Sequence, residues 1–258
     1  MAVHHGGKGP GHIARSIGGF NPRSLFAGGT QGLVYDFTGA TSVWQDTAGT
    51  VAAVNNSVVA RIDDKSGNGN NATQATGANQ PLYKTAPFPR VMFDGIDDIL
   101  ATAAINMSAR DEISVIMGVQ KLSDAATQVV AENTTGAGSF RVYIPAAGTS
   151  WVHGMTGTAS SDSPATGFAA VNTAVVTGLG KISTDTNIIR VNGAQQATTA
   201  TDQGTGNMGN FAVGLGARIG GTVPFSGSIF ALIIINRLLV ASEIAQAEAW
   251  VNARTGAF

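Results

Sequence analysis

Short apolar runs alternate with turn-forming residues along most of the chain. About ten runs between residues 33 and 236, such as EISVIMGVQ and GSIFALIIIN, are rich in Val, Ile, Phe and Thr, which favour β-strands. Gly, Asn, Asp and Ser separate these runs. Many short strands at this spacing are typical of a sandwich, a barrel or a jelly roll.

Two local patterns are sharper than the rest. The stretch NIIRVNGAQQAT places Asn192–Gly193 between two strand-like runs, which predicts a tight hairpin. After residue 238 the apolar period changes from that of a strand to that of a helix, with Ser242 as the expected N-cap and Gly256 beyond the end. The expected buried face of this one short C-terminal helix comprises Leu239, Ile244, Ala247, Trp250 and Val251.

Residues 1–20 differ from the rest of the chain. They are glycine-rich and mildly basic, and they have no apolar period. Two interpretations stay open: a disordered terminus, or an extended N-terminal arm that orders on a neighbouring subunit. No composition break occurs after residue 20, so we expect residues 21–258 to form one domain.

Composition narrows the function classes. Charged residues make up only 12% of the 258 residues, and the net charge is −1, so the chain has no basic field for nucleic acid. The absence of cysteine excludes disulfides and thiolate metal sites. The N-terminus lacks the apolar segment of a signal peptide, and no apolar run is long enough to span a bilayer. We therefore expect synthesis in a cytoplasm without a cleaved signal, and no membrane insertion.

The stretch RVMFDGIDDIL concentrates three carboxylates, Asp94, Asp97 and Asp98. If the flanking runs are the two strands of a hairpin, Asp97 and Asp98 point to opposite faces. A structural turn at Asp94–Gly95 is then the leading interpretation. The alternative is a calcium ion held by Asp94 or Asp97 with loop carbonyls, and calcium is the one cofactor that we consider.

Enzymatic chemistry has little support in the sequence. Glycoside hydrolysis needs two carboxyl groups that face each other across the sugar. Among the glutamates, only Glu132 lies near the middle of the expected sheet, and it has no partner close in sequence. His153 is the only histidine within the expected domain, and no Gly-x-Ser-x-Gly motif accompanies it, so a buried strand histidine is the favoured interpretation.

Sugar recognition is the main alternative to a purely structural role. It uses exposed aromatic rings together with amide, carboxylate and backbone groups that bind hydroxyls. The candidate ligand-binding residues are Trp44, Tyr143 and Trp151, whereas Trp250 is explained by helix packing.

Four motifs occur in the order found in one family. DDKSGNGNNATQ, VMFDGIDDIL, IIRVNGAQQAT and the final PFSGSIFALIIINRLLVASEIAQAEAWV resemble the motifs of the concanavalin A-like jelly roll, in its laminin-G-like branch. The N-terminal part, FNPRSLFAGGTQGLVYDF, resembles the head of proteins found in tailed-phage and prophage structural gene clusters. The resemblance implies an all-β concanavalin A-like jelly-roll sandwich over residues 21–258.

The same resemblance implies a non-enzymatic virion structural protein, such as a decoration, fibre or tail-accessory component. Its partners would be other capsid or tail proteins and sister subunits, with a homotrimer as one compatible state. We expect Phe20, Pro22, Leu25 and Phe26 to dock on the particle. A carbohydrate-binding module that recognises a host surface glycan is the second hypothesis, and a glycan hydrolase is the third.

Overall fold

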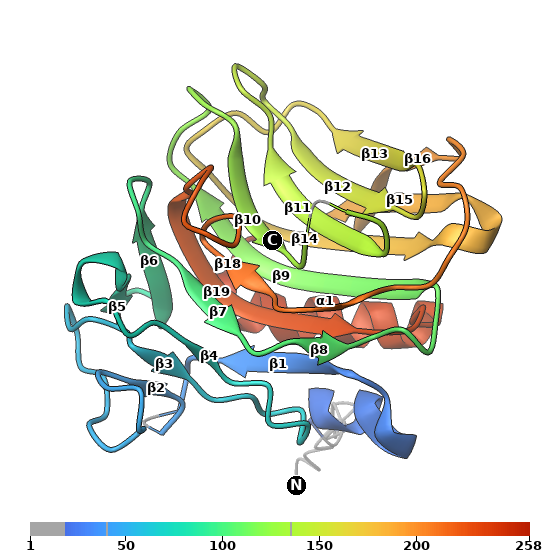
Figure 1. Cartoon of the computed structure of the whole chain (residues 1–258). Helices are drawn as coiled ribbons and strands as arrows, with labels where there is room; N and C mark the ends of the chain where they lie inside the picture. The colour runs from blue at the N-terminus through green and yellow to red at the C-terminus, as the bar shows by residue number, and fades with distance from the viewer. Residues whose placement is uncertain (1–18, 40, 135) are drawn as a thin grey trace, which may run out of the picture.

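Two antiparallel β-sheets stack face to face in the computed structural model, which describes residues 19–39, 41–134 and 136–258 (Figure 1). We call the first the helix-covered sheet, because α1 (Ala241–Thr255) packs on its outer face. Its strand order is β16 (Ala194–Thr199), β15 (Thr186–Val191), β14 (Asn172–Lys181), β9 (Glu112–Lys121), β19 (Ser226–Ile235), β6 (Arg90–Asp94) and β5 (Leu82–Lys84), and β1 (Gly32–Asp36) also pairs with β19.

The second sheet, the open sheet, has nine strands. Its order is β13 (Ser160–Ala165), β12 (Trp151–Thr156), β11 (Ser139–Ile144), β10 (Gln128–Glu132), β18 (Gly214–Leu215), β7 (Leu100–Thr102), β4 (Ala72–Thr73), β3 (Arg61–Ile62) and β2 (Val43–Trp44). The remaining elements are the pair β8 (Ile105–Asn106) and β17 (Asn210–Phe211) and three 3-10 helices, η1 (Pro22–Gly29), η2 (Gly77–Asn79) and η3 (Ile182–Thr184).

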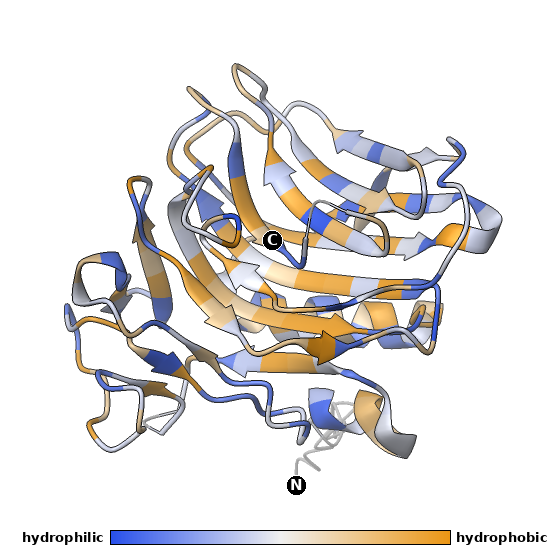
Figure 2. Ribbon diagram, in the orientation of Figure 1, coloured by the Kyte–Doolittle hydropathy of each residue, from blue (hydrophilic) through white to orange (hydrophobic). Residues whose placement is uncertain are grey.

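Burial of the strands follows from what covers each face. In β19, Leu232 and Ile234 face the core between the sheets, while Ile233 and Ile235 face α1, so the strand is apolar on both sides. Figure 2 shows this difference, because β9 and β19 are largely hydrophobic whereas β13 and β16 are mostly polar or intermediate. In the open sheet, the edge strand β13 alternates between exposed and buried residues, whereas β10 is buried along its whole length.

Helix α1 lies close to the helix-covered sheet because the strand beneath it carries glycine. A Cβ at Gly118 would lie 2.0 Å from the Thr255 hydroxyl oxygen, so a side chain there would push the helix away. The expected apolar face of α1 is confirmed, as is its end at Gly256, which has φ of 63°. The N-cap prediction was wrong. The helix begins after Val240, whose N–H donates to the Glu243 carboxylate at 3.0 Å, while Ser242 lies inside the first turn.

The all-β sandwich with one C-terminal helix is therefore confirmed, and so is the hairpin at Asn192–Gly193, where both residues have positive φ. Residues 1–18 of the expected arm lie outside the described residues, and the division at residue 20 stays a prediction. Within the part of the chain that the structure describes, no helix is both long and apolar enough to cross a bilayer.

One expected hairpin is instead a crossing between sheets. The runs on either side of Asp94–Gly95 are β6 and β7, and β6 belongs to the helix-covered sheet whereas β7 belongs to the open sheet. Residues 95–99 carry the chain from one sheet to the other and are not strand. Strand alternation therefore does not apply to the carboxylates in this segment.

Candidate functional site

The outer face of the open sheet carries a row of aligned side chains that runs across all nine strands. Inward neighbours such as Ile62, Leu100 and Leu215 are buried in the core, so these aligned residues point away from it. The strand register connects them without a break. From one edge to the other, this cross-strand row comprises Trp44, Arg61, Thr73, Ala101, Gly214, Glu132, Arg141, Gly154 and Asp162.

At one end of the row, charged and aromatic groups form a network. The Arg141 guanidinium donates to both carboxylate oxygens of Asp162 at 3.0 Å, and the Tyr143 hydroxyl donates to Asp162 at 2.9 Å. Burial, followed by the negative charge of Asp162, raises the pKa of Tyr143 to about 12, so its hydroxyl stays protonated. Gly154 makes this network possible, since a Cβ there would lie 2.6 Å from both Arg141 Nε and Asp162 Oδ1.

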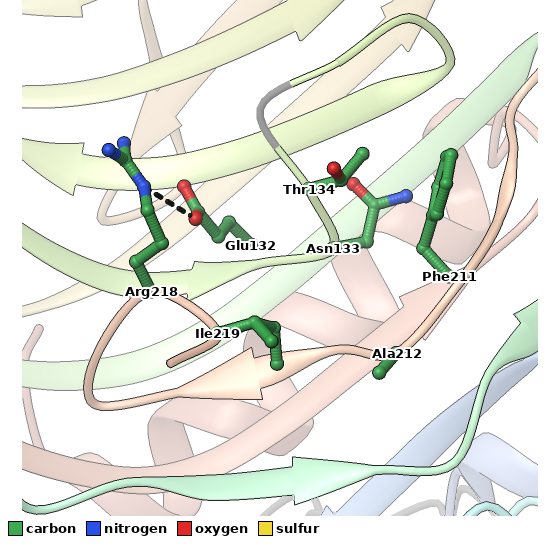
Figure 3. Close-up of a pocket in the computed structure, with 7 residues that line it drawn as sticks. All are labelled: Glu132, Asn133, Thr134, Phe211, Ala212, Arg218 and Ile219. Atoms are coloured by element: carbon green, nitrogen blue, oxygen red, sulfur yellow. Dashed lines mark hydrogen bonds and ion pairs between the residues drawn. The ribbon is translucent and has the colours of Figure 1, made fainter. Parts of the chain in front are cut away.

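Near the middle of the row lies a hollow of about 330 Å³ that we call the Glu132 hollow (Figure 3). Glu132 itself is fully buried, and its Oε1 accepts a hydrogen bond from Arg218 Nε at 2.9 Å. Among the described residues, no donor reaches the other oxygen, Oε2, which is buried. The hollow is lined by Glu132, Asn133, Thr134, Phe211, Ala212, Arg218 and Ile219.

A tight loop brings Arg218 over the sheet. After β18 the chain turns at Gly216, which has φ of 80°, and a short turn then joins Arg218 to Thr222 through a hydrogen bond of 2.9 Å. The Gly221 N–H donates to the Arg218 carbonyl at 2.8 Å, which closes the turn. These backbone bonds hold the base of the Arg218 side chain beside β10.

The electrostatics of this face are mixed. Glu132 lies directly opposite Arg141 on the neighbouring strand, and it is also paired with Arg218. Arg141 Nε, like Glu132 Oε2, is buried without a hydrogen-bond partner among the described residues.

The structure separates the three aromatic residues expected to bind ligand. Trp44 and Tyr143 are half-buried on the outer face of the open sheet, near opposite ends of the row. Trp151 is fully buried in the core between the sheets, and its Nε1 donates to Asn172 Oδ1 at 2.9 Å. Its ring offers no face to a ligand, which corrects that expectation, because an isolated tryptophan in a strand does not reveal which face it occupies.

Three carboxylates converge at the crossing between the sheets, with Asp94 at the end of β6 and Asp97 and Asp98 in the crossing segment. Ligand oxygens of Asp94, Asp97 and Asp98 all lie within 4.8 Å of one another, and among the described residues only this group of acidic, His or Cys side chains is so arranged. Asp98 is buried and accepts the Asp94 N–H at 2.9 Å, and burial raises the pKa of Asp98 to about 6. Oxygen ligands of this kind suit calcium, so the site at Asp94 and Asp97 stays a prediction, now with Asp98 beside it.

The residues expected to dock on a particle are largely used within the chain. Leu25 and Phe26 belong to η1 and are buried against β1, β19 and α1. Pro22, the first residue of η1, is buried too. Phe20 is partly buried against the same cluster. The apolar area of Pro22, Leu25 and Phe26 is therefore not free for a partner, because it already covers the helix-covered sheet.

His153 is a buried structural residue, as the sequence favoured. Its Nδ1 lies 2.8 Å from the Asn187 side-chain oxygen, and burial lowers the pKa of the imidazole to about 4. The chemistry of the open face was only partly visible in the sequence. Glu132 stood out there, whereas Arg141, Asp162 and Arg218 carried no motif, since strand register alone aligns them.

No family model and no curated protein matches the sequence, but solved structures match the fold. One is the binding domain of botulinum neurotoxin DC in complex with SialylT (TM-score 0.59, 11% identity, 82% of this chain and 51% of that one). Another comes from work on botulinum neurotoxin type C, whose cell entry is dependent upon interaction with two ganglioside molecules (TM-score 0.59, 11% identity, 86% of this chain and 51% of that one). A third is the ligand binding domain of serotype D with N-acetylneuraminic acid (TM-score 0.55, 12% identity, 73% and 48%).

The chain spans about half the length of these structures. At 11 to 12% identity, the likeness extends to the fold and no further. The all-β sandwich expected from the sequence is thus found in known binding domains, and no family is assigned to this chain.

Proposed function

We propose that this protein is a non-enzymatic glycan-binding domain, and that the outer face of the open sheet is its binding surface. The observation that carries the proposal is the Glu132 hollow, where a buried carboxylate holds a partly exposed arginine whose terminal nitrogens have no hydrogen-bond partner among the described residues. Phe211, partly buried in the same hollow, supplies an apolar surface against which a sugar ring can pack.

A hydroxyl-rich ligand fits the charge pattern better than an ion does. Along the row, Arg61, Glu132, Arg141 and Asp162 alternate in sign, so no net charge attracts a strongly cationic or anionic partner. A sugar hydroxyl accepts a hydrogen bond from a terminal N–H of Arg218, which the buried Glu132 carboxylate holds in place. Three of the similar solved structures concern sialylated or ganglioside ligands, which supports the same class of ligand.

The spacing of the carboxylates weighs against glycoside hydrolysis. The second acid in the row, Asp162, lies three strands from Glu132, which is roughly 14 Å at the usual spacing between strands. The two carboxyls of a glycosidase lie closer, at roughly 5–10 Å. Asp162 is also paired with Arg141 and Tyr143, so it is not placed to act on the same sugar.

A glycan array with labelled protein tests the proposal. We expect binding of particular glycans by the wild type, and a loss of at least tenfold in affinity for Glu132→Gln and for Arg218→Ala. Arg110→Ala is the matched control, because Arg110 is an exposed arginine away from this face, and its affinity should equal that of the wild type. Unchanged binding by both site variants, or no glycan binding at all, would contradict the proposal.

The role as a virion structural component stays a hypothesis that rests on the sequence resemblance. It is compatible with glycan binding, since a particle-borne domain of this kind could recognise a host surface. Deleting residues 1–20 tests the docking part of this hypothesis. If particles incorporate the shortened protein as well as the full chain, the N-terminal segment is not the attachment point.

A further inference from the structure

A second hollow lies on the same face of the open sheet, on the other side of the Arg218 loop. We call it the Asn79 hollow, and its volume is about 320 Å³. Ile219 lines both hollows, so they are adjacent. The lining residues that matter here are Thr73, Gln74, Thr76, Asn79, Ala101 and Ile219.

Ile219 forms a ridge between the two hollows. Its side chain lies over Gly214, where an added Cβ would be 3.1 Å from Ile219 Cδ1. Gly214 stands between Ala101 and Glu132 in the cross-strand row, so one hollow lies on each side of it. Ile219 is 42% exposed, which leaves apolar surface at the top of the ridge.

The chemistry of the Asn79 hollow differs from that of the Glu132 hollow. None of the residues that line it is charged, and its polar groups are amides and hydroxyls. Gln74 is engaged, because its side chain donates to the Ile99 carbonyl and accepts the Thr76 N–H. The side chains of Thr73 and Asn79 make no hydrogen bond within the described residues, so they are available to a ligand. Neutral groups that both donate and accept suit sugar hydroxyls.

The distance between the hollows sets the size of the ligand. Thr73 and Glu132 are three strands apart in the row, which is roughly 14 Å at the usual spacing between neighbouring strands. A single sugar ring does not bridge that distance. A chain of several sugars that lies across the strands does, and it places one ring on the exposed apolar surface of Ile219.

We propose that the ligand is a linear oligosaccharide that occupies both hollows and crosses Ile219. This inference rests on the proposed function, since it extends the Glu132 hollow to a longer binding groove. It predicts that affinity rises with chain length, because a longer ligand fills the Asn79 hollow as well. Recognition of only a terminal sugar would not produce that dependence.

The test uses the full chain and a panel of neutral and sialylated glycans, each offered as the mono-, di-, tetra- and hexasaccharide. Isothermal titration calorimetry should give at least tenfold tighter binding for the tetrasaccharide than for the disaccharide of the recognised series. Ala101→Leu fills the Asn79 hollow from its floor, and it should remove most of that gain while leaving disaccharide binding unchanged. The Asn79 side chain makes no hydrogen bond within the described residues, so Asn79→Ala does not endanger the fold. This variant should remove part of the gain in affinity of the tetrasaccharide over the disaccharide.

The outcomes separate this inference from the proposed function. Binding that depends on Glu132 but not on chain length would overturn the two-hollow groove and leave the Glu132 site standing. Equal losses for both chain lengths in Asn79→Ala would also overturn it. Absence of binding to every glycan in the panel would overturn both proposals.

Discussion

The buried histidine gives the fold a defined sensitivity to acid. His153 lies on β12, and its ring packs against Gly178, where a Cβ would be 2.2 Å from the ring. Within the part of the chain that the structure describes, Nδ1 bonds to Asn187, whereas Nε2 is buried without a partner. Burial, which disfavours the charged imidazolium, lowers the pKa to about 4 from 6.5.

The magnitude and sign follow by linkage. A pKa shift of one unit corresponds to about 1.4 kcal/mol, so the shift of His153 means that charging its imidazole costs about 3 kcal/mol more in the folded protein than in the unfolded chain. The unfolded chain takes up this proton below about pH 6.5, whereas the folded chain resists it until about pH 4. The stabilisation is therefore present above pH 6.5 and is lost as the pH falls to about 4.

We expect His153→Gln to remove this acid-dependent loss. Urea denaturation from pH 4 to pH 7.5 should show that the free energy of unfolding falls by about 3 kcal/mol more in the wild type than in the variant. Both proteins keep His4, His5 and His12, so their contributions cancel. Equal pH slopes would refute this argument. If the variant does not fold, an NMR titration of wild-type His153 decides the matter, since a pKa near 6.5 would refute it as well.

Further predictions concern the carboxylates and the core. Burial raises the pKa of Asp98 to about 6, so stability from its protonated form is present below about pH 4 and lost by about pH 6. The free energy of unfolding of Asp98→Asn, relative to that of the wild type, should therefore rise by up to about 3 kcal/mol from pH 4 to pH 8 in urea denaturation with chelator. A difference between the two proteins that does not change with pH would contradict this. Millimolar calcium should raise the wild-type Tm but not that of Asp97→Asn; equal Tm values in calcium and in chelator would count against a calcium site. Trp151→Ala should cost about 3–5 kcal/mol in chemical denaturation, because its ring is fully buried, and a loss below about 1 kcal/mol would contradict its place in the core. Gly118→Val should lower the Tm and loosen α1 by forcing the helix off β9, which hydrogen exchange of the helix amides would detect; unchanged exchange would show that the helix tolerates the contact.

Much of the local structure was readable from the order of residues. Asn192–Gly193 predicts its hairpin because both residues tolerate positive φ, and the turn needs no distant contact. The helical period from residue 239 onward predicts the buried face of α1, and Gly256 predicts its end. The density of short apolar runs predicts a β-sandwich, which the computed structure and the similar solved structures share.

Errors arose where a residue's role depends on which sheet or face its segment joins. VMFDGIDDIL looks like a hairpin, yet its two strands lie in different sheets, and its three carboxylates meet where the chain leaves β6 for the other sheet. Trp151 occupies the inward position of its strand, while Tyr143 occupies an outward one. A period of two divides a strand into two faces, but it does not say which face meets the core.

The amino-acid sequence by itself determined the class of fold, the turn at Asn192–Gly193 and the buried face of the helix, because these depend on short-range periodicity and backbone preference. The tertiary structure alone decided the outer face of the open sheet, which is the proposed binding surface. Glu132, Arg141 and Arg218 meet because β10 pairs with β18 and β11, and the order of strands in a sheet comes from long-range pairing that no local pattern encodes. The same pairing brings Thr73 and Ala101 onto one continuous surface with Glu132, although both precede it by more than 30 residues in the chain. Thr73 lies three strands from Glu132, and Ala101 lies two strands from it.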